Sequence, residues 1–570
     1  MDIVSPNKTK TDKIFEKVPP MITWLVIIFP IAGSLFIPEV VAIFILVFNV
    51  FFFYRSMAFS AQFLLGLIKI RSAKQVNWQA KVEGLDDIKG EISKLEGSRE
   101  QIKSLVFKDE FFKQVKSNNG FGKALLKLPK VFQKIIFFWS KFKTKNYING
   151  EIENLKEIRK MDLFSYKEIN HVIIIPHYKE PVEVLDDTLE RLSVSSFPKK
   201  QIHVVLGAEA RDSEGLSKSE KLRKKYGEIF CNIWVSNHVL TEHEIVGKSS
   251  NMAACGRVVY EEIKKLGWDL KRTTVTSCDA DSQLPQEYFS YLTYKFITTA
   301  DRHFKFYTGA VLLYANIWRL DFLARVRNSL STMYNVGKLV RPDKFIPFST
   351  YSTSFWLVKQ VGFWTPWITP EDFHIFFKTS FYFPKKVSTI PLFCKIMVDA
   401  AEGVNTIDTF KNNYYQSRRW QWGVSDDGWV LKNLVKRIGK LPFIVYYRGL
   451  HVMLDHILAP TSSFLIMLGA NLPPIINPRF ASTVFGARLP GISSTIVQLT
   501  LAAFMVAIIA DIFLKPKRDG VSLFKKLTTP LEWFLNPIVG FLLTSIPGLE
   551  AHTRLLFGKY LEYYATKKRA

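Results

Sequence analysis

Two aspartates separated by one residue, Asp279 and Asp281, lie directly after residues 273–277 (TTVTS), which have the β-branched composition of a strand. Carboxylates at this spacing can hold one hard divalent cation between the protein and a diphosphate. The cation would then neutralise negative charge that builds up on a departing nucleoside diphosphate. On its own an Asp-x-Asp triplet is a weak signal, because such triplets also occur by chance in loops.

A second acidic pair, Glu371 and Asp372, follows a Thr-Pro turn further along the chain. One of these carboxylates can act as a general base that removes a proton from a hydroxyl group. The alternative is the first turn of a helix, where unpaired backbone amides favour acidic side chains. The local sequence favours this alternative.

A third stretch, QSRRW, places Gln416, Arg418, Arg419 and Trp420 on an expected helix. Arginine guanidinium groups bind diphosphate oxygens through paired N–H donors, and the flat face of tryptophan can support a sugar ring. The alternative is a basic and aromatic belt at a membrane interface. The order of the three stretches, and the strand before the first, favour chemistry.

Apolar and helical patterns predict the elements that must position these residues. Strands are expected at residues 171–176, 201–207, 232–236 and 273–277, and helices at 182–192 and 250–265. Continuous apolar strands are typical of a parallel sheet that is buried on both faces. We therefore expect an open α/β sheet whose ligands bind beyond the carboxyl ends of its strands.

Long apolar runs near both ends of the chain predict a membrane portion. We expect a helical hairpin made of residues 21–38 and 40–54 (weaker to 70), an interfacial helix ending at Pro460, spans at 461–476 and 494–514, and a re-entrant element at 531–549. Arg55 and Lys69 follow the second run, so the positive-inside bias places that side in the cytoplasm.

The formal net charge of +26 is compatible with nucleic acid or with anionic lipid as a partner. Because long apolar runs accompany the charge, we favour membrane lipid and expect no nucleic acid. The four cysteines form no C-x-x-C pair, which is typical of reduced thiols in a cytoplasmic domain.

Taken in order, the DAD triplet, the Glu-Asp pair and QSRRW resemble the D-x-D, T/E-E-D and Q-x-x-R-W motifs of membrane-embedded family 2 glycosyltransferases, the group of the cellulose, chitin and hyaluronan synthases. The resemblance covers about residues 171–422. It implies a GT-A fold and an inverting, single-displacement transfer from a nucleotide sugar, of UDP type in our interpretation.

The resemblance also implies a role for each motif residue. Asp279 would contact the donor, and Asp281 together with Asp279 would ligate Mg²⁺ or Mn²⁺. Asp372, next to Glu371, would be the general base. The four motif residues of the third stretch would close over the diphosphate: Gln416, Arg418, Arg419 and Trp420.

Two further stretches are similar to the family. IPHYKE, with Pro176, Tyr178 and Glu180, resembles the loop that contacts the nucleotide base, and Lys248 lies in a turn that resembles one near the donor diphosphate. Glu209 stands where the family has an aspartate-containing turn. The Gly-Lys-Ser sequence at Lys248 is no phosphate loop, because the upstream glycine of that motif is missing.

These features predict five segments along the chain. They are a cytoplasmic N-terminus (1–20), the hairpin (21–70), a charged helical linker (71–166), a GT-A domain (167–430), and a membrane portion with two spans and a re-entrant element (431–570). In the linker, the basic amphipathic stretch Ala124–Phe142 can lie in the lipid headgroups or pack on protein.

The expected function is metal-dependent sugar transfer to a polysaccharide acceptor, with the catalytic domain on the cytoplasmic face of the plasma membrane. A single transfer to a lipid-linked acceptor is the alternative, because four spans are few for a polymer channel and residues 351–355 lack the Cys-Gly of the polysaccharide synthases. A non-catalytic membrane scaffold that retains the fold is the alternative from another class.

Overall fold

The computed structural model describes residues 7–104, 130–517, 529 and 531–561, so the stretch Ala124–Phe142 lies partly outside the described residues. The chain forms two compact units. The larger unit comprises residues 1–76, 170–292 and 303–570, and the smaller comprises 77–169 and 293–302.

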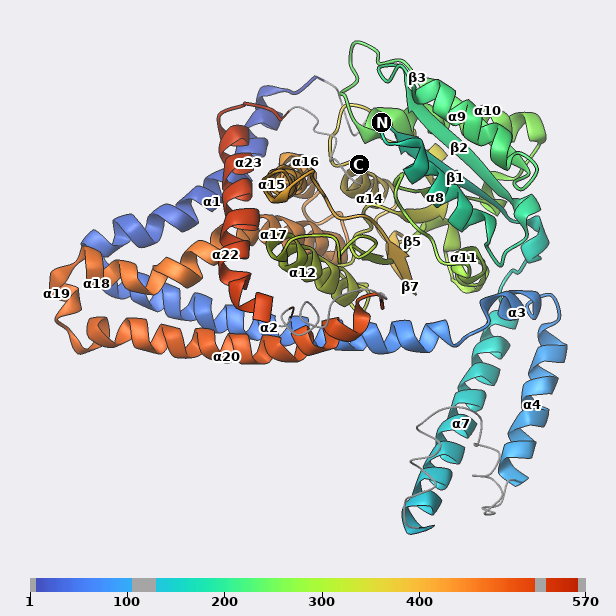
Figure 1. The fold of residues 1–570 in the computed structure, drawn as a ribbon, viewed down its shortest axis with the longest axis horizontal. Helices are drawn as coiled ribbons and strands as arrows, with labels where there is room; N and C mark the ends of the chain where they lie inside the picture. Colours follow the sequence, from blue (N-terminus) through green and yellow to red (C-terminus); the bar gives the residue numbers. More distant parts are fainter. Residues whose placement is uncertain (1–6, 105–129, 518–528, 530, 562–570) are drawn as a thin grey trace. The chain divides into compact units, whose positions relative to one another are not determined.

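An open sheet, with seven strands among the described residues, lies in the larger unit in the order β3-β2-β1-β4-β6-β5-β7 (Figure 1). The strands are β1 (Asn170–His177), β2 (Ile202–Glu209), β3 (Asn232–His238), β4 (Thr273–Ser277), β5 (Lys305–Leu312), β6 (Tyr351–Ser354) and β7 (Ser388–Met397). β6 runs antiparallel to β4 and β5, and the other neighbours are parallel. The open α/β sheet confirms the expected fold class, and all four expected strands are present.

The helices of the sheet domain connect and cover the strands. They are α8 (Val182–Ser193), α9 (Gly215–Tyr226), α10 (Lys248–Leu266), α11 (Tyr288–Thr298), α12 (Phe322–Lys338), α13 (Phe355–Gln360), α14 (Glu371–Tyr382), α15 (Thr406–Gln421) and α16 (Val424–Lys436). The main apolar core joins residues of β1, β2, β4 and β6 to α10, α13, α14 and α16. Burial of both sheet faces explains the continuous apolar strands.

Gly207 lets α10 approach the sheet closely. A Cβ added at Gly207 would lie 2.6 Å from Cys255 Sγ and 2.8 Å from Asn251 Oδ1, both on α10. The Asn251 side chain donates to the Gly207 carbonyl at 2.7 Å. The first residue of α10, Lys248, follows Gly247, whose φ of 154° favours glycine. This backbone brings Lys248 to the carboxyl edge of the sheet.

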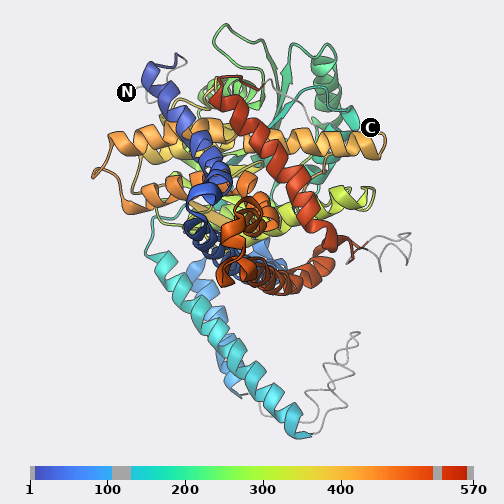
Figure 2. The ribbon, with the colours of Figure 1, turned by 90° about the vertical axis from the view of Figure 1, so that its left-hand side faces the viewer.

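Five helical segments among the described residues are long and apolar enough to cross a membrane. They are α1 (Lys10–Phe36), α2 (Pro38–Lys74), α17 with α18 (Phe443–Ile476), α20 (Val484–Leu514) and the segment Leu531–Leu556, which contains α22 (Asn536–Gly540) and α23 (Ile546–Leu556). These helices flank the sheet domain, as expected. α2 and α20 lie side by side, as Figures 1 and 2 show. The re-entrant path of the last segment stays a prediction.

The helix α17 (Phe443–Leu468) runs through Pro460 without the division expected there. A proline inside a helix removes one backbone hydrogen bond. The hydroxyl of Thr461 donates to Ile457 O at 2.9 Å, and that of Ser462 donates to Leu458 O at 2.6 Å. Side-chain hydroxyls of this kind supply extra hydrogen bonds to the backbone beside a proline in an apolar helix, and α17 stays continuous.

Ion pairs and a hydrogen bond join the apolar helices to one another and to α12 of the sheet domain. Arg55 of α2 pairs with Asp455 of α17 at 2.9 Å, and the Tyr334 hydroxyl of α12 donates to the same carboxylate at 2.9 Å. Arg325 of α12 pairs with Glu532. A buried charge is costly unless it is paired, so these contacts hold α12 against three apolar segments.

The smaller unit is built around the helices α3 (Trp78–Glu83), α4 (Ile88–Ser104) and α7 (Lys130–Arg159). α4 and α7 pack as a hairpin. Ile88, Ile92, Ile148 and Ile152 are buried in this unit. The helical character expected of residues 71–166 is present in the described part.

Candidate active site

The predicted acidic triplet lies at the point where the sheet reverses its strand order. From β1 the chain passes to β2 and β3 on one side, and it then crosses to β4 on the other side. Open α/β sheets bind ligands outside the carboxyl ends of the strands at such a point. Asp279 and Asp281 follow the end of β4, and Tyr178 and Glu180 follow the end of β1.

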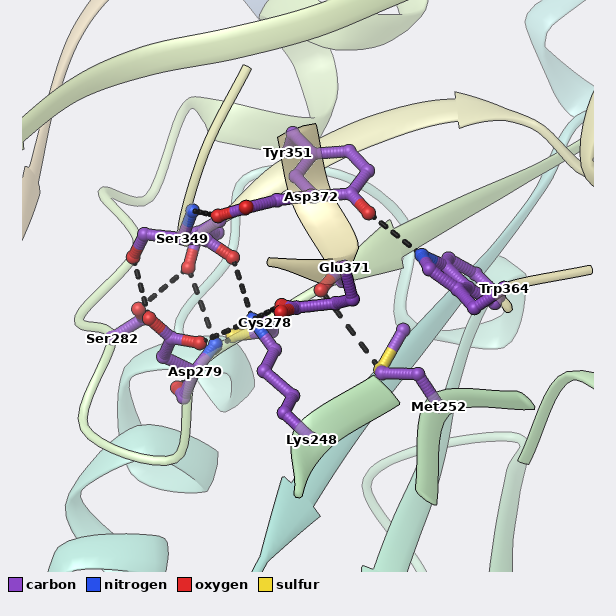
Figure 3. Close-up of polar contacts among 12 residues, drawn as sticks. Lys248, Met252, Cys278, Asp279, Ser282, Ser349, Tyr351, Trp364, Glu371 and Asp372 are labelled. Atoms are coloured by element: carbon purple, nitrogen blue, oxygen red, sulfur yellow. Dashed lines mark hydrogen bonds and ion pairs between the residues drawn. The ribbon is translucent and has the colours of Figure 1, made fainter. Parts of the chain in front are cut away.

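Lys248 brings the first two predicted motifs together (Figure 3). Its ammonium lies 2.5 Å from Asp279 Oδ1 and 3.0 Å from Glu371 Oε1. Asp279 follows β4, and Glu371 is the first residue of α14. Residues that are far apart in the sequence therefore share one charged cluster.

The charges of this cluster depend strongly on one another. Burial alone would lower the pKa of Lys248, but Asp279, Glu371 and Asp372 raise it well above its usual value. Burial raises the pKa of Glu371 to about 7, although the ammonium of Lys248 opposes that shift. The carboxyl group of Glu371 therefore changes its charge near neutral pH.

A loop before β6 completes the cluster with two residues that sequence reasoning missed. The Ser349 hydroxyl donates to Asp279 Oδ2 at 2.6 Å, and its backbone N–H donates to Asp372 Oδ2 at 2.9 Å. The Thr350 hydroxyl oxygen accepts from the Asp279 N–H at 3.2 Å. Neither residue type is unusual in a loop, so nothing in the local sequence marks them.

Asp281 and Asp279 have the donor chemistry of a cation shared with a ligand. Asp281 is buried, and its Oδ2 accepts from the Asp399 N–H at 2.9 Å. Among the described residues, no group of three or more His, Cys, Asp or Glu side chains could hold a metal. Mg²⁺ is usually bound by one or two carboxylates together with substrate phosphates. The two aspartates fit this mode and not an all-protein cage.

Glu209 and Tyr178 are joined through Arg211, which sequence reasoning had not assigned. Glu209 ends β2 and pairs with Arg211, whose guanidinium lies 4.5 Å from the centroid of the Tyr178 ring. Burial raises the pKa of Glu209, and Arg211 opposes the shift. Pro176 of β1 lies opposite Gly207 of β2, so these residues share one end of the sheet.

The loop after β1 is closed by two carboxylates. Glu180 Oε2 accepts from the Tyr178 N–H at 2.5 Å, and Asp212 Oδ2 accepts from the Lys179 N–H at 2.9 Å. Lys179 has a φ of 62°, which is uncommon outside glycine. The expected nucleotide-base residues thus form a second cluster at the carboxyl edge of the sheet.

The third predicted motif lies on α15 and is organised by Arg327 of α12. The Arg327 guanidinium donates to Gln416 Oε1 at 2.7 Å and to Ser417 Oγ at 2.9 Å. It also lies 4.4 Å from the centroid of the Trp420 ring, which is 42% exposed. Burial lowers the pKa of Arg327 to about 9, so the group keeps its charge at neutral pH. No sequence motif had singled out Arg327.

Arg418 and Arg419 of the same motif have different surroundings. Arg418 pairs with Glu550 of α23 at 2.6 Å and lies over the Tyr415 ring. Arg419 is partly buried.

The helix α16, which follows α15, contacts α14. Asp426 of α16 lies 2.9 Å from His374 Nδ1 of α14. The helix that carries Asp372 is thereby tied to the helix that follows the motif.

No family model matches the chain, and no curated protein matches it. It is similar to the solved structure of mannosyltransferase PcManGT from Pyrobaculum calidifontis in complex with GDP-Man and Mn²⁺, with 13% identity, a TM-score of 0.36, and coverage of 63% of this chain and 93% of that chain. It is also similar to S. aureus TarS 1–349 in complex with UDP-GlcNAc, with 14% identity, a TM-score of 0.29, and coverage of 70% and 93%. Likenesses with TM-scores below 0.5 are too distant to indicate a function.

Proposed function

We propose that the chain is a membrane-bound, metal-dependent glycosyltransferase of the inverting type, which transfers a sugar from a UDP-type nucleotide sugar to a polysaccharide acceptor at the cytoplasmic face of the plasma membrane. The single observation that supports it most is the cluster of Lys248, Asp279, Glu371 and Asp372 at the carboxyl edge of the sheet (Figure 3).

In this proposal the residues at this edge of the sheet have separate roles in binding the donor. Asp279 and Asp281 would hold Mg²⁺ or Mn²⁺, which supplies positive charge to the leaving diphosphate. The Lys248 ammonium adds a fixed positive charge beside Asp279. Tyr178, Glu180 and Glu209 lie at the same edge and bind the nucleotide base.

Asp372 performs the proton transfer. Its two carboxylate oxygens accept from the backbone N–H groups of Ser349 and Phe373, at 2.9 and 2.7 Å, which fixes the orientation of the side chain. Asp372 takes the proton of an acceptor hydroxyl while that oxygen bonds to the anomeric carbon. The bond from this carbon to the diphosphate oxygen breaks, and the attack from the opposite face inverts the configuration.

The α15 motif borders the acceptor side. The exposed face of Trp420 offers a flat surface for a sugar ring, and Arg327, which donates to Gln416, lies against the ring and holds it in place. Arg419 supplies the diphosphate contact, while Arg418 is engaged by Glu550. The apolar helices that pack on α12 and α16 keep the site next to the bilayer.

The test uses the full chain in lipid with Mn²⁺ and a panel of nucleotide sugars, and it measures released nucleoside diphosphate and product length. We expect one donor to be consumed, and a long product would favour the polysaccharide acceptor over a single lipid-linked one. Asp372→Asn should lower turnover by about 10²–10⁴-fold, because a general base contributes that much, while donor binding persists.

The matched control is Asp269→Asn. Asp269 caps a short helix outside the site, and asparagine caps equally well. The control should therefore transfer like the wild type. Turnover of no donor by the wild type, or full turnover by Asp372→Asn, would contradict the proposal.

A further inference from the structure

Ser349 has a backbone conformation that serine rarely adopts. Its φ is 61°, in the left-handed region that favours glycine and, to a lesser degree, asparagine and aspartate. Strained residues of this kind persist only where their surroundings enforce the conformation, and they cluster at functional sites. The contacts of Ser349 show what the strain achieves.

Three groups of Ser349 point to three different predicted site residues (Figure 3). The hydroxyl donates to Asp279 at 2.6 Å, and the backbone N–H donates to Asp372 at 2.9 Å. The carbonyl oxygen accepts from the Lys248 ammonium at 3.1 Å. One residue therefore links the aspartate expected to face the donor with the expected base.

Thr350 enforces this conformation from the other side. Its side chain is fully buried, and its hydroxyl lies 2.7 Å from that of Ser282. Its carbonyl accepts from the Thr308 hydroxyl of β5 at 2.7 Å. The loop is thus fastened to β5 and to the turn that follows β4, which leaves Ser349 little freedom to relax.

We propose that Ser349 is a positioning residue for the transfer reaction: its hydroxyl and its amide hold Asp279 and Asp372 at one fixed spacing, so that donor and acceptor are aligned. This inference rests on the proposed glycosyltransferase function. Without the hydroxyl, Asp279 loses the contact that ties its Oδ2 to the Ser349 loop, and it can turn away from the donor.

Three substitutions separate positioning from a merely structural role. Ser349→Ala removes the hydroxyl and keeps both backbone contacts. Ser349→Asn keeps a side-chain donor and suits the left-handed conformation. Ser349→Gly removes the hydroxyl and relieves the strain. If Ser349 only fills space, alanine should be nearly neutral, asparagine should be the worst, and glycine should be the best.

The positioning role predicts a different order, in which asparagine retains donor binding and alanine and glycine lose it. Ser349→Ala should raise the KM for the donor by about tenfold, as expected for one lost hydrogen bond to a charged group, with kcat changed less. Ser349→Asn should recover most of this loss. Ser349→Gly should bind the donor as weakly as alanine, although its melting temperature equals or exceeds that of the wild type.

A binding measurement without turnover separates failure of the positioning role of Ser349 from failure of the glycosyltransferase proposal. UDP and GDP, each with Mn²⁺, are titrated into the wild type, the three variants and Asp269→Asn. The positioning role is supported if Ser349→Ala and Ser349→Gly bind the nucleotide more weakly than the wild type while Ser349→Asn and Asp269→Asn do not. Equal affinity of wild type and Ser349→Ala, with equal KM, overturns this role and leaves the glycosyltransferase proposal intact. Absence of nucleotide binding and turnover in the wild type overturns both.

Discussion

The guanidinium of Arg327 lies 4.4 Å from the ring centroid of Trp420, and this contact joins α12 to α15. Arg327 is buried, and its guanidinium donates to side-chain oxygens of four residues: Asn328, Asn413, Gln416 and Ser417. A buried cation surrounded by neutral dipoles is costly to keep, and the stacked tryptophan face contributes to its stabilisation. The contact with Arg327 thereby holds the exposed ring of Trp420 in place.

We expect Arg327→Met to lower both stability and transfer. The change leaves Gln416 and Ser417 without their donor, so unfolding should require about 2–4 kcal/mol less free energy. The kcat/KM for transfer should fall by about as much in Arg327→Met as in Trp420→Ala. The double variant should be little worse than either single one, because removal of one partner already breaks the contact. Melting temperature and steady-state kinetics measure this.

Arg325→Met is the matched control for this cycle. Arg325 lies on the same helix and is also buried, but it pairs with Glu532. Its loss should destabilise the protein and add independently to the effect of Trp420→Ala. Additivity of Arg327→Met with Trp420→Ala would contradict the coupling.

Metal removal should separate Asp281 from Glu371 and Asp372, which are not assigned to the cation. With EDTA in place of Mn²⁺, the wild type should bind UDP or GDP at least about tenfold more weakly, because the cation screens the diphosphate. Asp281→Asn should bind the nucleotide weakly with or without EDTA. Its fold should persist, because the asparagine oxygen can still accept from the Asp399 N–H. If EDTA weakened nucleotide binding to Asp281→Asn as much as binding to the wild type, the role of Asp281 would be refuted.

The pH dependence of stability should identify Glu371. Its pKa is about 7 in the folded protein against an ordinary value of 4.5, and burial is the cause. Between these values the folded state holds the proton and the unfolded state does not, so the wild type loses stability as the pH rises from about 5 to 8. Glu371→Gln removes this loss and should gain relative stability over the same range.

Thermal unfolding of both proteins at several pH values measures the effect of Glu371. The Lys248 ammonium keeps its pairing with Asp279 in the variant, so the difference follows the single carboxyl group. Asp269→Asn should track the wild type at every pH. If the difference in stability between Glu371→Gln and the wild type were the same at every pH, Glu371 would have the same pKa in the folded and unfolded states.

The sequence allowed the sheet domain to be predicted where burial leaves a local pattern. Apolar runs mark β1 and β2. β4 (TTVTS) has a single valine among hydroxyl residues, but it follows the predicted helix of α10 in the alternation of strands and helices, and Asp279 follows it as expected. The strand β6 (Tyr351–Ser354) was missed because it is short and rich in hydroxyl groups. Its residues are fully buried, and Thr276 and Ser352 pair through their hydroxyls at 2.7 Å. Tertiary contacts, not local hydrophobicity, define this strand.

The candidate site shows the same division. The carboxylates of Asp279, Glu371 and Asp372 could be selected by residue type and order, although their roles stay predictions. Ser349 and Arg327 could not be selected, because a serine in a loop and an arginine in a helix carry no local signal. Their importance arises from a left-handed backbone and from the packing of α12 on α15, which depend on the whole fold.

Arg418 of the QSRRW motif is engaged by the C-terminal apolar segment. It pairs with Glu550 at 2.6 Å, and the Tyr414 hydroxyl donates to the same carboxylate at 2.8 Å. The two partners of the ion pair are mostly buried, with 17% and 26% of their side chains exposed. We therefore expect Arg418 to anchor α15 to α23, while Arg419 serves the diphosphate.

A charge exchange tests this anchoring role. Arg418→Glu or Glu550→Arg alone brings like charges together, so each should cost about 1–3 kcal/mol of stability and lower kcat/KM. The double exchange restores an ion pair, and it should return both the melting temperature and kcat/KM to nearly wild-type values. The same exchange at Arg319 and Glu402, an ion pair outside the α15–α23 contact, should leave transfer unchanged. Recovery of the melting temperature without recovery of transfer would assign the Arg418 guanidinium to the donor instead, because a glutamate at this position cannot bind a diphosphate.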